Sequence, residues 1–158
     1  MRTAISVTAN SLPRCQQVLG GALIVQRGKV LLLQRHATEA VLPGQWVLPS
    51  GKKELGEQLE EAVKREAAEE TGCEVVVERL FNYYEYGSDA RGMLRDCTQL
   101  NFLCRIIDPS AQVTVSSEHA TYRWFGPADL AAIQNQNIRR TLEEIFRQTA
   151  PVKKLRWI

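Results

Sequence analysis

Histidine is scarce in this chain, and its cysteines are scattered. Only two of the 158 residues are histidine, and no C-x-x-C pair occurs among the four cysteines, Cys15, Cys73, Cys97 and Cys104. Zinc sites in proteins usually gather cysteine and histidine ligands at short spacings, so a zinc centre is not expected. We expect the cysteines to be reduced and structural, as in a cytoplasmic protein.

Long hydrophobic runs and a strong charge of one sign are also missing. No apolar stretch approaches the roughly 20 residues of a membrane span, and residues 1–14 lack the continuous apolar segment of a signal peptide. The net charge of +2 gives no reason to expect nucleic acid or a membrane as a partner. With 44% apolar and 24% charged residues in a chain of 158, the composition is that of one globular domain.

The chain is expected to have three parts. Residues 1–16 are polar and rich in turn-forming residues, and we expect a flexible N-terminal arm. Residues 17–150 carry the apolar patterns of a folded domain, and residues 151–158 (PVKKLRWI) form a basic tail. No internal repeat or low-complexity segment interrupts this division.

Apolar, β-prone runs lie on both sides of one helical stretch. Residues 18–26 and 29–34 flank an Arg-Gly pair, a spacing that predicts a β-hairpin. Further strands are expected at residues 74–86, 97–107 and 117–126. A short helix starting at Pro127 and an amphipathic helix over residues 139–148 should follow. This order predicts a mixed α/β fold.

Three features of the predicted strands bear on the core and on a binding site. The Gly20-Gly21 pair suggests a bulge or a place where a ligand approaches the backbone, but it could equally be a simple edge distortion, which we favour. Trp46 could face a substrate, but an aromatic residue in a short strand is more often part of the core. In the strand over residues 97–107, Gln99 and Asn101 should face the same way.

Residues 51–73, GKKELGEQLEEAVKREAAEETGC, form the most informative stretch. Between Glu57 and Glu70 there is no glycine, proline or asparagine, and good helix formers dominate. We therefore expect a helix here, with Gly72 as its C-terminal cap. Leu59, Ala62 and Val63 define an apolar stripe on one side of this helix.

The apolar stripe of this helix becomes acidic in its last turns. At about 100° per residue, Glu66 and Glu70 fall within the stripe and Glu69 lies at its edge. Half-buried carboxylates repel one another unless a positive charge neutralises them, and Arg65 alone cannot balance three. A divalent cation such as Mg²⁺ could do so. A solvated charged face is the other interpretation, and the pattern alone leaves both open.

The whole stretch resembles the Nudix box, G-x5-E-x7-R-E-U-x-E-E-x-G-U, in which U is a bulky aliphatic residue. The fixed positions of the box are matched by Gly51, Glu57, Arg65, Glu66, Glu69, Glu70 and Gly72. Two aliphatic positions hold Ala67 and Cys73 instead, which affects local packing rather than the chemistry. The resemblance implies a Nudix-type α/β/α sandwich with a central mixed β-sheet and the box helix against one face.

The resemblance also implies an activity. Nudix hydrolases cleave a diphosphate linkage in a nucleoside diphosphate derivative and depend on Mg²⁺, for which Mn²⁺ can substitute. The metal ligands would be Glu66, Glu69 and Glu70, with help from the Gly51 carbonyl. Glu66 is also a candidate general base. The expected partner is a small-molecule nucleotide, and the protein would be a monomer or a homodimer.

Two residues of the box and two beyond it complete the candidate site. Arg65 would hold a carboxylate through a salt bridge, and Glu57 would support the loop before the helix or an outer ion. In other Nudix proteins the general base lies in a loop before a late strand, where this chain has Glu118. Glu118 could equally be an ordinary exposed carboxylate. Its neighbour His119 could assist, although a lone loop histidine is more often a bystander.

The substrate is less well determined by the sequence. In other Nudix proteins, particular residues after the box accompany specificity for ADP-ribose or for diadenosine polyphosphates. Those residues are absent from residues 88–91 of this chain. A nucleoside triphosphate or related pterin triphosphate, split into monophosphate and pyrophosphate, is the main expectation. The alternatives are a nucleotide-sugar or ADP-ribose pyrophosphatase, and a non-catalytic nucleotide-sensing module. Arg35, Arg91 and Arg95 are loop arginines that could hold terminal phosphates.

Overall fold

A mixed β-sheet forms the centre of the molecule. The computed structural model describes residues 13–89 and 92–150, and seven strands of this part share one sheet in which the path β3-β2-β1-β6-β5 is extended by β4 on β1 and β7 on β2. Their bounds are β1 Arg14–Gln26, β2 Lys29–Arg35, β3 Trp46–Val47, β4 Ser50–Lys52, β5 Val75–Ser88, β6 Leu94–Ile106 and β7 His119–Phe125. The β1–β6 pair is parallel and the other described pairs are antiparallel, so the sheet is mixed as predicted.

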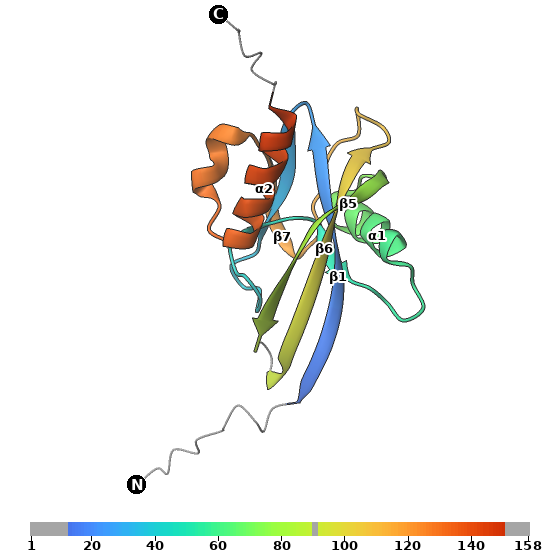
Figure 1. Ribbon diagram of the computed structural model, residues 1–158, viewed down its shortest axis with the longest axis vertical. Coiled ribbons are helices and arrows are strands. Elements are labelled where there is room, and N and C mark those ends of the chain that lie inside the picture. The colour runs from blue at the N-terminus through green and yellow to red at the C-terminus, as the bar shows by residue number, and fades with distance from the viewer. Residues whose placement is uncertain (1–12, 90–91, 151–158) are drawn as a thin grey trace, which may run out of the picture.

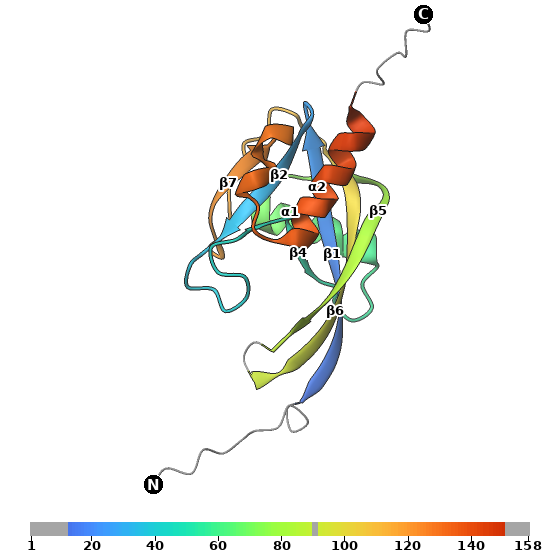
Figure 2. The ribbon, with the colours of Figure 1, turned by 60° about the vertical axis from the view of Figure 1, so that its left-hand side comes forward.

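Helices cover both faces of this sheet. The α1 helix (Leu59–Thr71) lies on one face, and the 3-10 helix η3 (Pro127–Ala132) and α2 (Gln136–Thr149) lie on the other (Figure 1). Figure 2 shows α2 in front of the sheet and α1 behind it. The predicted α/β/α sandwich is therefore confirmed. No helix of the described ranges is long and apolar enough to cross a membrane.

The β1 strand divides the core into two halves. Its side chains alternate, so that Ala22 and Ile24 pack with Val63 of α1, whereas Leu23 packs with Leu142 of α2. All five side chains are fully buried. Residues 22–25 of β1 (ALIV) are apolar without interruption because both faces of this part of the strand are covered.

The box helix has nearly the predicted bounds. It begins at Leu59 rather than at Glu57 and ends at Thr71. Gly72 follows with a φ of 69° and donates its N–H to the Ala68 carbonyl at 2.9 Å. Glycine adopts this left-handed conformation without strain, so the cap is the one expected.

The Gly20-Gly21 pair does not form the predicted bulge or edge distortion. The β1 strand lies inside the sheet and keeps its register with β6 through both glycines. A Cβ at Gly20 would lie 2.7 Å from Val63 Cγ2 of α1, and a Cβ at Gly21 would overlap Asn101 Oδ1. The pair is needed because a helix and a polar side chain approach β1 closely from its two faces.

The folded domain begins earlier in the chain than predicted. The β1 strand starts at Arg14 and pairs with β6 from that residue onward, so residues 14–16 belong to the sheet and not to the predicted arm. Residues 1–12, Arg91 and the tail over residues 151–158 lie outside the described residues. Trp46 packs edge-on against Phe125 with ring centroids 5.0 Å apart, which confirms its assignment to the core.

Candidate active site

A cleft of about 800 Å³ brings the predicted site residues together. The acidic end of α1, several strands of the sheet and the start of α2 line it. The predicted residues among those that line it are Gly51, Arg65, Glu66, Glu69, Glu70 and Glu118. Arg35 and Arg95 also line the cleft. Residues distant in sequence thus share one cavity, as a catalytic site requires.

Glu66 lies directly against the backbone of β4. A Cβ at Gly51 would overlap the Glu66 carboxyl group, so glycine alone lets the strand approach this side chain. Glu66 Oε1 accepts a hydrogen bond from Arg65 Nη1 at 2.7 Å. Burial raises the pKa of Glu66, Arg65 opposes this effect, and the nearby negative charges of Glu69 and Glu118 add to it.

Glu70 is the most deeply buried acid of the cleft, with 7% of its surface exposed. Its Oε2 accepts a hydrogen bond from the Ser50 backbone N–H at 2.9 Å, which fixes the carboxylate beside β4. Burial raises the pKa of Glu70 to about 8, and the neighbouring charges of Glu66 and Glu118 contribute. A carboxylate held in such a place is electrostatically unfavourable unless a cation joins it.

Glu69 behaves differently from the other two box acids. Its side chain is 59% exposed and lies 3.5 Å from Arg65 Nη1. It therefore lies at the rim of the cleft, as its position at the edge of the helical stripe predicts. Glu66 and Glu70 form the inner pair.

Arg65 ties the loop before α1 to the helix. Its Nε and Nη2 donate to the two carboxylate oxygens of Glu57 at 2.8 and 3.0 Å, and Nη2 also donates to the Lys52 carbonyl at 3.1 Å. Glu57 in turn accepts from the Glu54 backbone N–H. Its hydrogen bond with Arg65 lowers the pKa of Glu57 to about 2. The salt bridge predicted for Arg65 and the loop support predicted for Glu57 are both present.

Glu118 and Arg35 line the cleft as an ion pair. Arg35 Nη1 lies 3.5 Å from Glu118 Oε2, and Arg35 is held further by Glu39 Oε2 at 3.0 Å and the Val41 carbonyl at 2.8 Å. The Glu118 side chain is 59% exposed, so it keeps contact with solvent. Its charge acts on both Glu66 and Glu70, which places all three acids in one electrostatic unit.

His119 is buried rather than free in a loop. It is 3% exposed, and its Nδ1 lies 3.2 Å from Ser116 Oγ. Among the described residues its Nε2 has no hydrogen-bond partner. Burial lowers the pKa of His119, with the positive charge of Arg35 adding to the effect, so the ring stays neutral near pH 7. These features favour a structural role.

The inner acids fit a divalent cation that shares its coordination with a ligand. Within the described ranges, no three His, Cys, Asp or Glu side chains are grouped so that they could hold a metal ion by themselves. Mg²⁺ seldom uses such a cage: it keeps several waters and takes one or two carboxylates plus phosphate oxygens. Glu66 and Glu70, two neighbouring oxygen donors whose pKa values burial raises, match that requirement.

The sheet side of the cleft contains residues that the sequence did not single out as functional. Tyr84, Tyr86 and Gln99 line it from β5 and β6, and Asn137 lines it from α2. Gln99 and Asn101 share one buried face, as predicted. The alternation of polar residues in β6 was the available signal, but it could not show that the polar face borders a cleft.

The chain is similar to known proteins in sequence and in fold. The NUDIX domain family matches residues 17–147. The nucleoside triphosphatase NudI of Escherichia fergusonii is 28% identical over 134 residues, which cover 80% of this chain and 94% of that protein. The crystal structure of the MutT protein from Methanosarcina mazei Go1 aligns with a TM-score of 0.74 and 26% identity, over 89% of this chain and all of that one (100%).

A second solved structure supports the fold alone. The NUDIX hydrolase from Nitrosomonas europaea aligns with a TM-score of 0.69 at 24% identity and covers 84% of this chain and 71% of that chain. The two proteins therefore share the fold of the domain.

Proposed function

Because this chain belongs to the NUDIX domain family and is therefore a pyrophosphohydrolase, we propose that it hydrolyses a nucleoside triphosphate, or a related triphosphate, to a monophosphate and pyrophosphate. The reaction would depend on Mg²⁺, with Mn²⁺ as a substitute. The similarity to a protein named nucleoside triphosphatase supports this choice of substrate. The expectations of a cytoplasmic location and of a monomer or homodimer stay predictions.

One observation carries the proposal: the buried Glu70 and the half-buried Glu66 border a cleft that also contains Arg35. The acids alone would repel a polyphosphate. Divalent cations bound there would neutralise the phosphates and lower the pKa of a water molecule. Arg35, which Glu39 and Val41 hold in place, would contribute a fixed positive charge for a phosphate oxygen.

Glu66, Glu70 and Arg65 would act mainly by position. The Ser50 N–H orients Glu70, and Arg65 orients Glu66 while holding the preceding loop through Glu57. Both acids are therefore fixed before a ligand binds. This preorganisation reduces the ordering that binding would otherwise require.

Glu118 is the better candidate for the general base. It lines the cleft with its side chain 59% exposed and only a long contact of 3.5 Å to Arg35, whereas Glu66 is half-buried and bonded to Arg65 at 2.7 Å. A general base needs access to the water that it deprotonates, and Glu118 has that access. Glu66 would then serve as a ligand only.

A panel of nucleotides tests the proposal. Ribo- and deoxyribonucleoside triphosphates, a pterin triphosphate, ADP-ribose and nucleotide sugars are incubated with Mg²⁺, Mn²⁺ or EDTA, and products are separated by anion-exchange chromatography. We expect monophosphate and pyrophosphate from a triphosphate, only with metal. Turnover confined to ADP-ribose or nucleotide sugars would replace the substrate class, and binding without turnover would indicate a nucleotide sensor.

A further inference from the structure

A line of polar side chains runs through the sheet from α2 to the cleft. Asn82 of β5 contacts α2, Asn101 of β6 contacts Asn82, and Gln99 of β6 contacts Asn101 and lines the cleft. Asn101 is completely buried and Gln99 is 4% exposed. Buried amides are costly unless they are hydrogen-bonded, so a connected line of them points to a specific use.

The contacts with α2 determine which way the amide group of Asn82 points. Asn82 Nδ2 donates to Thr141 Oγ1 and to Glu144 Oε2, both at 3.2 Å. A carboxylate can only accept. The Thr141 hydroxyl gives its own proton to the Asn137 carbonyl at 2.9 Å, so its oxygen is left as an acceptor here as well. Both partners require the NH₂ group of Asn82 to face α2.

The orientation of Asn82 determines the orientation of each following side-chain amide up to the cleft. With its NH₂ toward α2, Asn82 presents Oδ1 to Asn101, which donates from Nδ2 at 2.9 Å. Asn101 then presents its own Oδ1, which accepts from Gln99 Nε2 at 3.0 Å. The other amide atom of Gln99, Oε1, accepts no hydrogen bond from the described residues. It is also not among the fully buried polar atoms that lack a partner. It is a fixed acceptor at the cleft.

An aromatic wall stands beside this acceptor. Tyr84 of β5 is the direct cross-strand partner of Gln99. The ring centroids of Tyr84 and Tyr86 lie 6.0 Å apart. Both rings line the cleft. Aromatic rings bind the flat faces of nucleobases by stacking, while an amide reads a base edge by hydrogen bonding.

Building on the proposed function, we propose that Gln99 is a specificity-determining residue which selects nucleobases carrying an exocyclic amino group. A carbonyl at the same position of the base would face Gln99 Oε1, acceptor against acceptor. The amide cannot turn to donate instead, because Asn101, Asn82 and finally Glu144 and Thr141 hold the opposite direction. Gly21 makes the line possible, since a Cβ there would overlap Asn101 Oδ1.

Nucleotide pairs that exchange or remove an amino group test this selection. ATP and ITP, CTP and UTP, and GTP and ITP are compared by kcat/KM in the wild-type protein with Mg²⁺. At least one amino-bearing nucleotide should exceed its partner by about tenfold, the effect of one well-placed hydrogen bond in a buried site. Equal or better turnover of the carbonyl or amino-free partner in every pair would overturn the proposal.

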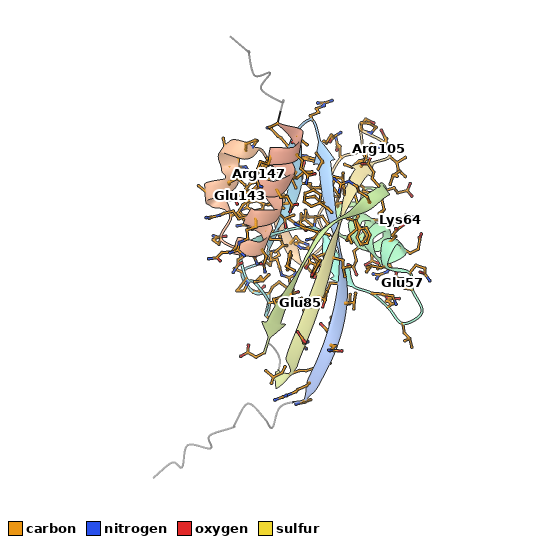
Figure 3. All side chains as sticks on the ribbon, in the orientation of Figure 1. Glu57, Lys64, Glu85, Arg105, Glu143 and Arg147 are labelled. Carbon is orange, nitrogen blue, oxygen red and sulfur yellow. The ribbon has the colours of Figure 1, made fainter. Side chains whose placement is uncertain are left out.

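Two variants separate recognition from folding. Gln99→Leu removes the acceptor and should reduce the preference to within about twofold. Glu144→Gln replaces a carboxylate that can only accept hydrogen bonds, so the preference for the amino-bearing nucleotide should fall. Glu143→Gln, an exposed neighbour on α2 (Figure 3), is the matched control and should change nothing. A preference that survives in Gln99→Leu would also overturn the proposal, and thermal unfolding checks that each variant folds.

Binding titrations keep this test independent of catalysis. AMP and IMP, or CMP and UMP, are titrated calorimetrically into wild-type protein and Gln99→Leu. If no triphosphate is hydrolysed but the amino-bearing monophosphate binds about tenfold more tightly, the proposed function fails and the assignment of Gln99 holds. If hydrolysis occurs and neither assay shows a preference, the assignment of Gln99 fails alone.

Discussion

Single residues decide how the acidic cluster is held. Glu66 and Glu70 are neighbours on one helix face, yet different groups stabilise them: Arg65 for the first and the Ser50 N–H for the second. Glu69, one residue away from Glu70, is bonded only loosely to Arg65 at the rim. The three glutamates of the motif therefore have unequal environments and should have unequal effects when changed.

Glu118 offers the sharpest prediction at this scale. If it is the general base, Glu118→Gln should lower kcat by roughly 10²–10⁴-fold, the usual range for such a group, and leave KM within a few-fold. Steady-state kinetics with the best nucleotide measure both. Glu85→Gln, an exposed carboxylate on β5 (Figure 3), is a control. A change in KM alone would assign Glu118 to binding and return the base to Glu66.

At the scale of elements, the contact between β1 and α1 sets the position of the box. Gly20 lies under Val63, and β4, which pairs with β1, brings Gly51 against Glu66. Helix, edge strand and central strand thus form one unit. A shift of α1 away from β1 would move the carboxylates relative to the rest of the cleft.

Gly20→Ala tests that unit. The added Cβ would lie 2.7 Å from Val63 Cγ2, so α1 or β1 must move. Overpacking of this kind costs about 1–3 kcal/mol of unfolding free energy, measured by urea unfolding. In the control Gly87→Ala, the new Cβ would meet nothing closer than 3.9 Å, so stability should hardly change. Equal stability of both variants would show that α1 tolerates a looser fit.

At the scale of the whole molecule, the cluster should link stability to pH and to metal. The folded pKa of Glu70 is about 8 against an ordinary 4.5, so its contribution to stability is complete below about pH 4.5 and is lost as pH rises through 8. Without metal, the wild-type protein should lose more stability than Glu70→Gln between about pH 5 and 8. Mg²⁺ at pH 8 should restore the wild type only.

Thermal unfolding in EDTA and in excess Mg²⁺ provides the measurement. Each kcal/mol corresponds to about 2–4 °C in Tm for a domain of this size. Parallel pH curves for the wild type and Glu70→Gln in EDTA would contradict the link. An equal rise in the Tm of both proteins on addition of Mg²⁺ would also contradict the link.

The sequence was sufficient for those parts of the fold and site that depend on short spacings. Glu66 and Glu70 could be placed on one face because the helical period alone relates them, and the Gly72 cap follows from one residue type. The line from Glu144 to Gln99 could not be predicted, because it needs the β5–β6 register and the seat of α2 on the sheet. The prediction for Gly20-Gly21 was wrong for the same reason: the groups that approach the pair are distant in sequence.

Binding of Mn²⁺, followed by the loss of the free-ion signal in electron paramagnetic resonance, tests the central claim most directly. Wild-type protein, Glu70→Gln, Glu66→Gln/Glu70→Gln and the control Glu143→Gln are titrated with and without the monophosphate product. We predict bound Mn²⁺ in the wild type and the control, at least about tenfold weaker binding in Glu70→Gln, since a charged ligand is lost from a buried site, and none in the double variant. Equal Mn²⁺ binding by all four proteins would contradict the assignment of Glu66 and Glu70 as the residues that bind the cation.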